Sequence, residues 1–204
     1  MKKPVILAIG HSRIVNNRVE GGAVSVGGIS EHAYWSDVAP RVETYLEDVR
    51  QPVQIIDSYQ GAGYTEAMIW LGNQCRSLNA LCAVELHFNS ASPSANGHEW
   101  PYWQKSMRSL SLASALECAF NEEFSGKIRA RGVKPRIKPS TAAERANNRG
   151  WQFTYYTPCP AVIAEPFFGS NESDWKIAVE HKQRVAAAIA CGILDWIEDE
   201  SPAL

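Results

Sequence analysis

Three polar side chains of this sequence stand where short apolar runs end. His11 comes just after the first such run, His87 lies near the end of a later one, and Glu165 directly follows the last. Runs of this kind predict buried strands, and in an open α/β sheet the loops beyond the carboxyl ends of the strands form the crevice. A hydrolytic zinc ion needs about three ligands from His, Glu, Asp or Cys, and a nearby carboxylate to accept a proton from water. We therefore expect a metal site at this edge of the sheet.

The strand that contains His87 has an unusual polar face. In Ala83-Val84-Glu85-Leu86-His87-Phe88-Asn89, alternation puts Glu85, His87 and Asn89 on one side. Such a face is typical of an exposed edge strand or of a functional site, and the pattern alone leaves both open. Glu165 favours the site, because it ends an unbroken apolar strand and so falls at the rim of the sheet.

Glu31, in the first turn of the first expected helix, is a weaker candidate ligand. Glu31 follows Ser30, a good helix cap, and a glutamate in the first turn is also favoured by the helix dipole alone. His32 adjoins it and is an alternative ligand. His11, in a glycine- and serine-containing turn, would be weak evidence alone, so only the combination of residues indicates a site.

Hydrophobic periodicity predicts strands that alternate with helices, and therefore an α/β fold. Expected strands are Pro4 to Ile9, Val53 to Asp57, Leu81 to Phe88, Trp100 to Trp103, Gln152 to Tyr156 and Ala161 to Ala164. We expect Trp100 to Trp103 at a sheet edge, because Pro101 cannot donate a ladder hydrogen bond. Expected helices begin near Glu31 with a kink or restart at Pro40, and span Thr65 to Leu78, Ser106 to Phe124 and Asp174 to Asp199.

Length, composition and charge limit the kind of protein. The 204 residues, 45% hydrophobic, suit a single domain over residues 1–204 without a separate appended binding module. The 20 basic and 22 acidic side chains give a net charge of −2, which argues against binding to nucleic acid or to anionic membranes. The segment Lys127 to Arg149 is rich in Lys and Arg. We interpret it as a solvated surface loop, with a cationic rim for an anionic substrate as the alternative.

Cysteine usage and the N-terminus bear on location. Five cysteines without a CxxC pair argue against a disulfide framework and indicate reduced thiols. The apolar stretch after Lys2 and Lys3 is interrupted at Gly10 before a signal-peptide core could form, and no run approaches the ~20 apolar residues of a membrane span. We expect a protein made in the cytoplasm, not inserted in a membrane, that acts after release by another factor.

Six motifs in order resemble the zinc-dependent N-acetylmuramoyl-L-alanine amidases, from about Ile6 to Trp175. They are Gly10-His11-Ser12, Gly22-Ala23 with Glu31, Glu85 to Ala91, Gly97-His98-Glu99 with Tyr102, Arg131-Gly132-Val133-Lys134, and Pro160 to Phe168 with Ser170-Asn171. The resemblance implies a mixed, mostly parallel central sheet with helices on both faces. It also implies one Zn²⁺ held by His11, Glu31 and His87, with Glu165 as general base.

The same resemblance implies the substrate, which is the amide between the muramic-acid lactyl group and the L-alanine of peptidoglycan. Arg131 and Lys134 are candidate contacts to stem-peptide carboxylates, with the surface-loop interpretation preferred for both, and Asn89 either positions the substrate carbonyl or caps its loop. A single catalytic domain of this type is similar to the endolysins that phages use for lysis, and we expect a monomer.

Three other functions remain open from the sequence. A zinc peptidase cutting within the stem peptide would use the same ligands, and a wall-binding relative could keep the scaffold without activity. A thiol hydrolase built on Cys159 is less favoured, because Cys159 lies between Pro158 and Pro160 without an evident base nearby in sequence.

Overall fold

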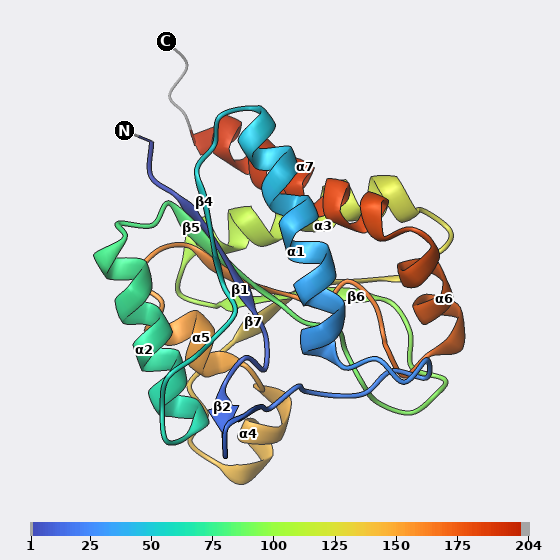
Figure 1. Ribbon diagram of the computed structural model, residues 1–204, viewed down its shortest axis with the longest axis horizontal. Coiled ribbons are helices and arrows are strands. Elements are labelled where there is room, and N and C mark those ends of the chain that lie inside the picture. The colour runs from blue at the N-terminus through green and yellow to red at the C-terminus, as the bar shows by residue number, and fades with distance from the viewer. Residues whose placement is uncertain (1, 201–204) are drawn as a thin grey trace.

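The first apolar run forms a strand that is buried on both faces. In the computed structural model, which describes residues 2–200 (Figure 1), β1 (Val5–Ile9) has side chains at most 2% exposed. It pairs in parallel with β4 (Val53–Ile56) on one side and β5 (Cys82–Leu86) on the other. Parallel neighbours and helices on both faces explain why this strand shows no polar alternation.

The central sheet has six strands in the order β4-β1-β5-β8-β6-β7. The first four run parallel, with β8 (Ala161–Ala164) beside β5. β6 (His98–Trp103) is antiparallel to β8 and parallel to β7 (Ala130–Arg136). The prediction of a mixed, mostly parallel sheet in an α/β fold is confirmed. The carboxyl ends of β1, β5 and β8 therefore meet at one edge.

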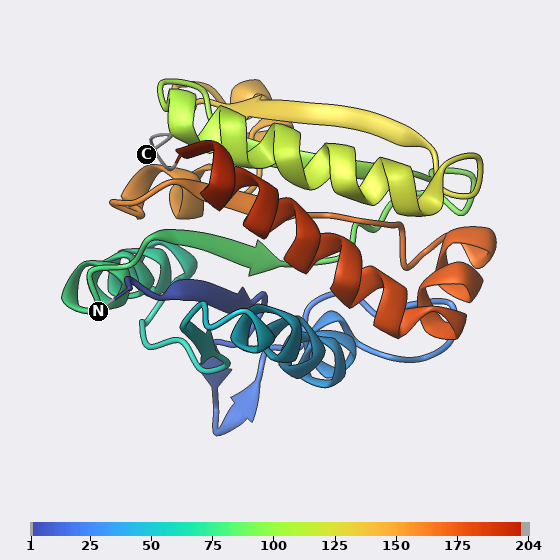
Figure 2. The ribbon, with the colours of Figure 1, turned by 90° about the horizontal axis from the view of Figure 1, so that it is seen from above.

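Helices cover both faces of the sheet. One face packs against α1 (Glu31–Asp48), α3 (Met107–Phe124) and α7 (Lys182–Glu200), which lie across the near side in Figure 2. The other face packs against α2 (Tyr64–Ser77) and α5 (Trp151–Tyr156). The smaller elements are β2 (Ile14–Val15), β3 (Arg18–Val19), α4 (Ala142–Asn147) and α6 (Glu172–Glu180).

The edge position expected for Trp100 to Trp103 is wrong. β6 lies between β8 and β7, and a ladder with β8 holds on both sides of Pro101 through the pair Tyr102↔Val162 and the bridge Glu99↔Glu165. Proline removes one donor from that ladder without ending the strand.

Four further sequence expectations are corrected. Gln152 to Tyr156 is helical, within α5, which follows the left-handed Gly150 (φ 79°) and buries Phe153 against the sheet, so packing overrides the strand preference of its aromatic residues. The segment Lys127 to Arg149 contains β7 and α4 as well as loop. The last helical region, expected as one helix, is two helices, because α6 ends at Glu180 and α7 begins at Lys182. α1 runs through Pro40 as one continuous helix.

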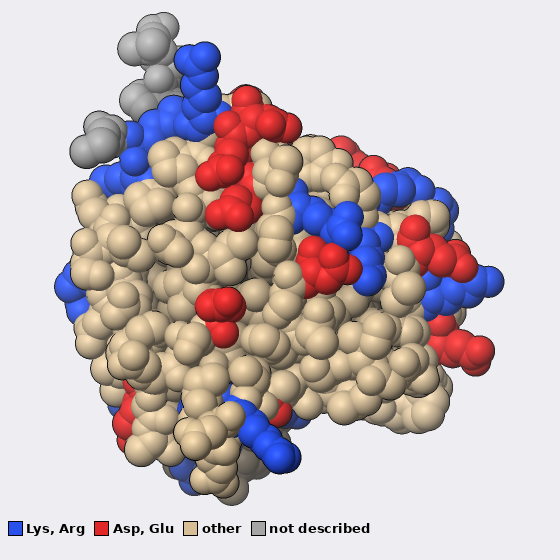
Figure 3. All heavy atoms as spheres, in the orientation of Figure 1, with Lys and Arg blue, Asp and Glu red and all other residues tan. Residues whose placement is uncertain are grey.

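Surface charge and helix hydropathy complete the description of the fold. On the face shown in Figure 3, basic and acidic side chains are interspersed rather than gathered by sign. Within residues 2–200, each helix is too short or too polar to cross a bilayer.

Candidate metal centre

His11 is delivered by a tight turn at the end of β1. The ladder continues one residue past the strand, since Gly10 N donates to Leu86 O (2.9 Å), and Ser12 Oγ donates back to Ile9 O (2.5 Å). His11 itself has a left-handed backbone (φ 57°), which is uncommon for a residue with a side chain. The turn thus projects the imidazole beyond the sheet edge.

His87 extends β5 by one residue at the same edge. Its backbone N donates to Ala164 O (2.9 Å), so it is held against β8. The ring packs directly on Gly10, where an added Cβ would lie 2.3 Å from the imidazole carbon Cε1. Only a glycine leaves this space, and Gly10 therefore sets how closely the two histidines approach.

Glu31 is oriented by backbone amides from two other segments. It begins α1 after Ser30, whose side chain accepts from Ala33 N. Its Oε2 accepts from Ala23 N (2.7 Å) and its Oε1 from Phe88 N (3.1 Å). These bonds orient the carboxylate along the sheet edge. The position of Glu31 is therefore set by more than the helix dipole.

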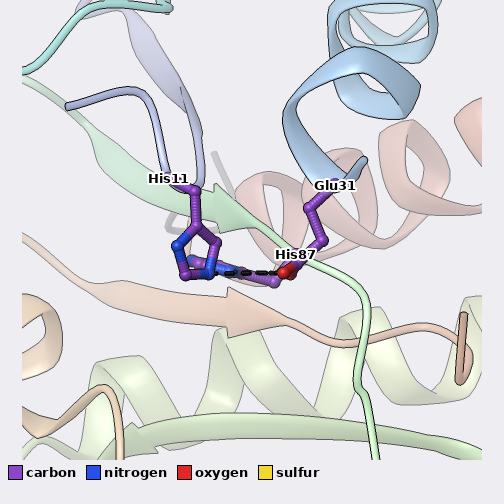
Figure 4. Close-up of side chains that lie close together, drawn as sticks. All are labelled: His11, Glu31 and His87. Atoms are coloured by element: carbon purple, nitrogen blue, oxygen red, sulfur yellow. Dashed lines mark hydrogen bonds and ion pairs between the residues drawn. The ribbon is translucent and has the colours of Figure 1, made fainter. Parts of the chain in front are cut away.

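The three side chains converge, as Figure 4 shows. His11 Nε2 lies 3.3 Å from Glu31 Oε2, and His87 Nδ1 lies 3.2 Å from Glu31 Oε1. One donor atom from each of the three residues lies within 4.8 Å of the other two. Two imidazoles and one carboxylate form a donor set that suits zinc and leaves a coordination position for water. His11 is the one side chain of the three that solvent reaches appreciably.

The electrostatics of this group favour a positive charge at its centre. Burial opposes charge on Glu31, but the hydrogen bond and charge of His87 and the charge of His11 outweigh it and hold the pKa of Glu31 below its usual value. Burial also acts to lower the pKa of His87, yet the carboxylates of Glu85 and Glu31 raise it well above its usual value. Burial and His87 together lower the pKa of His11. A cation between these residues would replace the proton that His87 otherwise holds.

Glu165 lies beside His87 on the adjacent strand. The pair Leu86↔Ala164 is in register, so the next residues along, His87 and Glu165, are neighbours on one face. Its Oε2 is buried without a hydrogen-bond partner among the described residues. The pKa of Glu165 is raised to about 8, mainly by burial and with contributions from the charges of Glu31 and Glu99, against the opposing charges of His87 and Arg136. An unpartnered buried carboxylate of this kind is typical of a functional group.

The other candidates lie outside the group of three. His32 follows Glu31 on the helix and approaches Ser36 Oγ (3.4 Å) through Nδ1. Asn89 Oδ1 accepts from Ser90 N, which is the loop-capping arrangement. Arg131 binds Glu99 (2.8 Å) and stacks on Phe168, whereas Lys134 lies partly exposed on β7.

The motifs in the sequence contain Gly10 and Gly22, but give neither residue a role. The structure shows that the absence of a side chain is what matters, because an added Cβ on Gly22 would lie 2.6 Å from both Glu31 Oε2 and His11 Cδ2. Sequence reasoning missed Tyr59, which binds Glu85, because this contact depends on tertiary packing and leaves no pattern in the chain. Glu85 was signalled by the alternation of polar residues on β5 and by its motif.

Comparisons with known proteins bear on the family of this chain. A family model described as N-acetylmuramoyl-L-alanine amidase matches residues 5–195. No curated protein sequence matches the chain.

Several solved structures have the same fold. The amidase AmiC2 of Nostoc punctiforme is 20% identical, with a TM-score of 0.73 over 96% of this chain and 98% of that chain. The catalytic domain of the amidase CwlV from Bacillus (Paenibacillus) polymyxa var. colistinus is 21% identical, with a TM-score of 0.73 over 96% and 98%. The catalytic domain of the CD27L endolysin, which targets Clostridia difficile, is 20% identical, with a TM-score of 0.73 over 94% and 97%.

Proposed function

Because this chain belongs to the N-acetylmuramoyl-L-alanine amidase family, we propose that it hydrolyses the lactyl–L-alanine amide of peptidoglycan with one zinc ion held by His11, Glu31 and His87. Glu165 is the general base in this proposal. The observation that carries it is the convergence of three donor atoms within 4.8 Å beside an unpartnered buried carboxylate.

The zinc ion supplies Lewis-acid chemistry when bound: it polarises the amide carbonyl and lowers the pKa of water toward ~7. Glu31 contributes the single negative charge of the ligand set. The amides of Ala23 and Phe88 fix the orientation of its carboxylate, so that each oxygen faces one imidazole. The ligands are therefore positioned by backbone that is fixed before substrate arrives.

Glu165 moves the proton in this account. Its Oε2 has no hydrogen-bond partner among the described residues, and its pKa is raised to about 8, mainly by burial. A carboxylate with a pKa close to the working pH can take a proton from water and then pass it to the departing alanine nitrogen. Its neighbour on β6, Glu99, is already occupied by Arg131.

The candidate substrate contacts beyond the scissile amide are the three residues that the sequence analysis named: Arg131, Lys134 and Asn89. Arg131 is half exposed on β7 and already balanced by Glu99, so any contact with a stem-peptide carboxylate would share its guanidinium. Lys134 lies on the same strand, in register with Pro101 of β6. Asn89 caps its own loop and would contact the substrate through its amide nitrogen.

The setting that we propose is lysis of the phage type. The likeness in fold to the CD27L endolysin catalytic domain supports it. The purified protein, added to cells whose outer barrier has been permeabilised, is then expected to clear the suspension, and intact turbidity with full activity on isolated wall would contradict a lytic role.

Mass spectrometry of digested peptidoglycan tests the bond that is cut. The proposal predicts stem peptides that begin with a free L-alanine amine and glycan that keeps its lactyl groups. Shortened stems that remain attached to sugar would identify a peptidase instead. Undigested wall that retains the protein would indicate a binding relative.

A further inference from the structure

Resting on the proposed zinc site, we infer that Glu85 is a positioning residue that holds His87 with Nδ1 toward the metal, and that Tyr59 locks this arrangement to the His11 turn. Neither residue belongs to the group of three ligands. Both lie behind it, on the side of the sheet that packs against α2 and α5.

Glu85 is a buried carboxylate in a strand that is otherwise apolar. It is 1% exposed, and its registered neighbours across the sheet are Ala8 of β1 and Ile163 of β8. A carboxylate in such surroundings is costly unless it is paired. Its position therefore needs partners that compensate for burial.

The contacts of Glu85 lead to the proposed metal site. Oε2 makes an ion-pair contact of 3.3 Å with Nε2 of His87 and has no hydrogen-bond partner among the described residues. Oε1 accepts from the hydroxyl of Tyr59 at 3.3 Å. Both oxygens are thus directed at one ligand and one tyrosine.

The two ring nitrogens of His87 face opposite partners. Nδ1 faces Glu31 Oε1 at 3.2 Å, inside the ligand group, while Nε2 faces Glu85. Carboxylates therefore face both nitrogens. A neutral imidazole has one N–H and one lone pair, so when a cation lies between Nδ1 and Glu31 the remaining proton is on Nε2, where Glu85 faces it. The negative charge of Glu85 behind the ring then makes Nδ1 a better donor to the cation.

Tyr59 connects this pair to the other histidine. Its backbone N donates to Ser12 O (3.0 Å), directly after His11, while its hydroxyl reaches Glu85. The side chain is 3% exposed. One residue therefore fixes the turn that presents His11 and the carboxylate that orients His87.

The experiment measures zinc affinity by competition with a coloured chelator, in the full chain, for wild type, Glu85→Gln and Tyr59→Phe. Glu85→Gln is expected to weaken zinc binding by about 10- to 100-fold, as loss of an outer partner of a metal-bound histidine does. Tyr59→Phe removes one hydrogen bond and is expected to weaken zinc binding by about fivefold.

The matched control is Asp174→Asn, since Asp174 is also a buried carboxylate but accepts from Gly97 N and Phe168 N, away from the ligands. Its zinc affinity is expected to equal that of wild type.

A spectroscopic readout separates positioning from general destabilisation. Ring ¹⁵N shifts of the zinc-loaded wild-type protein are expected to show His87 protonated at Nε2 and bound to metal through Nδ1. Metal bound through Nε2, or unchanged affinity in a folded Glu85→Gln variant, would overturn the inference. Neither measurement uses substrate, so a chain that binds zinc in this way but leaves the lactyl–alanine bond intact would refute the proposed function alone.

Discussion

Glu31 Oε1 lies 3.2 Å from Nδ1 of His87, although 56 positions separate the two residues in the chain. The same oxygen accepts from the backbone N of Phe88, immediately after His87. Helix α1 is therefore anchored by its first residue to the end of β5. Any change that moves this helix start relative to the sheet edge moves one ligand away from another.

This relationship predicts that Glu31→Gln abolishes tight zinc binding. The amide keeps the size of the side chain but loses the negative charge between the two imidazoles. Zinc affinity is expected to fall by more than the about 10- to 100-fold that loss of an outer partner costs, as measured by chelator competition. His32→Ala is the control, and we expect near-wild-type affinity for it. The reverse pattern would make His32 the ligand in place of Glu31.

Glu165→Gln is expected to separate binding from chemistry. The variant should retain one zinc per chain, because its side chain lies outside the group of three donors. Its turnover is expected to drop by about 10²- to 10⁴-fold, the usual contribution of a general base, in a peptidoglycan digestion assay. Turnover close to that of wild type would show that another group accepts the proton.

Gly10→Ala tests the close approach of β1 to the His87 ring. The new Cβ would lie 2.3 Å from that ring, so the imidazole must move. We expect a free energy of unfolding lower by about 1–3 kcal/mol, the usual cost of overpacking, together with weaker zinc binding. Gly63→Ala is the matched control, because its Cβ would meet mainly the mobile end of Glu66. Equal zinc affinities for the two variants would argue against this role of Gly10.

We expect the stability of the fold to decrease in acid, because His98 is buried in its neutral form. The ring is fully buried in β6, and Nδ1 accepts from the indole N–H of Trp100 (3.0 Å), so the folded chain holds it neutral. Burial lowers its pKa from 6.5 to about 4. As the pH falls below 6.5, the unfolded chain takes up this proton first, and the fold loses stability between pH 6.5 and about 4, by up to about 3 kcal/mol.

His98→Gln provides the comparison for that prediction, since its amide oxygen can still accept from Trp100. Urea unfolding between pH 4 and pH 7 should show a shallower loss of stability on acidification in the variant than in wild type. Parallel curves for the two proteins would mean that His98 does not hold its neutral form in the fold.

Much of the site was predictable because strand ends are readable in the sequence. His87 and Glu165 end apolar runs, and in a parallel block such ends share an edge, which is where the structure brings them together. Ser30 signalled that a helix begins at Glu31, and its capping bond to Ala33 N is present, but Glu31 as a ligand was implied only by the family resemblance. The structure also brings His11 to this group, at the turn after β1.

The parts that could not be predicted depend on contacts between distant segments. β7 was not predicted, because Gly132 and Pro135 lower the strand propensity of its sequence. Its pairing with β6 stabilises the strand in spite of this low propensity. α5 has the aromatic composition of a strand, but follows the left-handed Gly150 and packs against α2. No local sequence pattern shows that Tyr59 reaches Glu85.

The central claim is most directly tested by removing and restoring the metal. Purified protein, stripped with a chelator and dialysed, is titrated with zinc while release of stem peptides from peptidoglycan is followed by mass spectrometry. The account predicts no release from the stripped protein, and recovery that is complete at one zinc per chain and absent in His87→Ala. Full release by the stripped protein, or restored activity in His87→Ala, would contradict it.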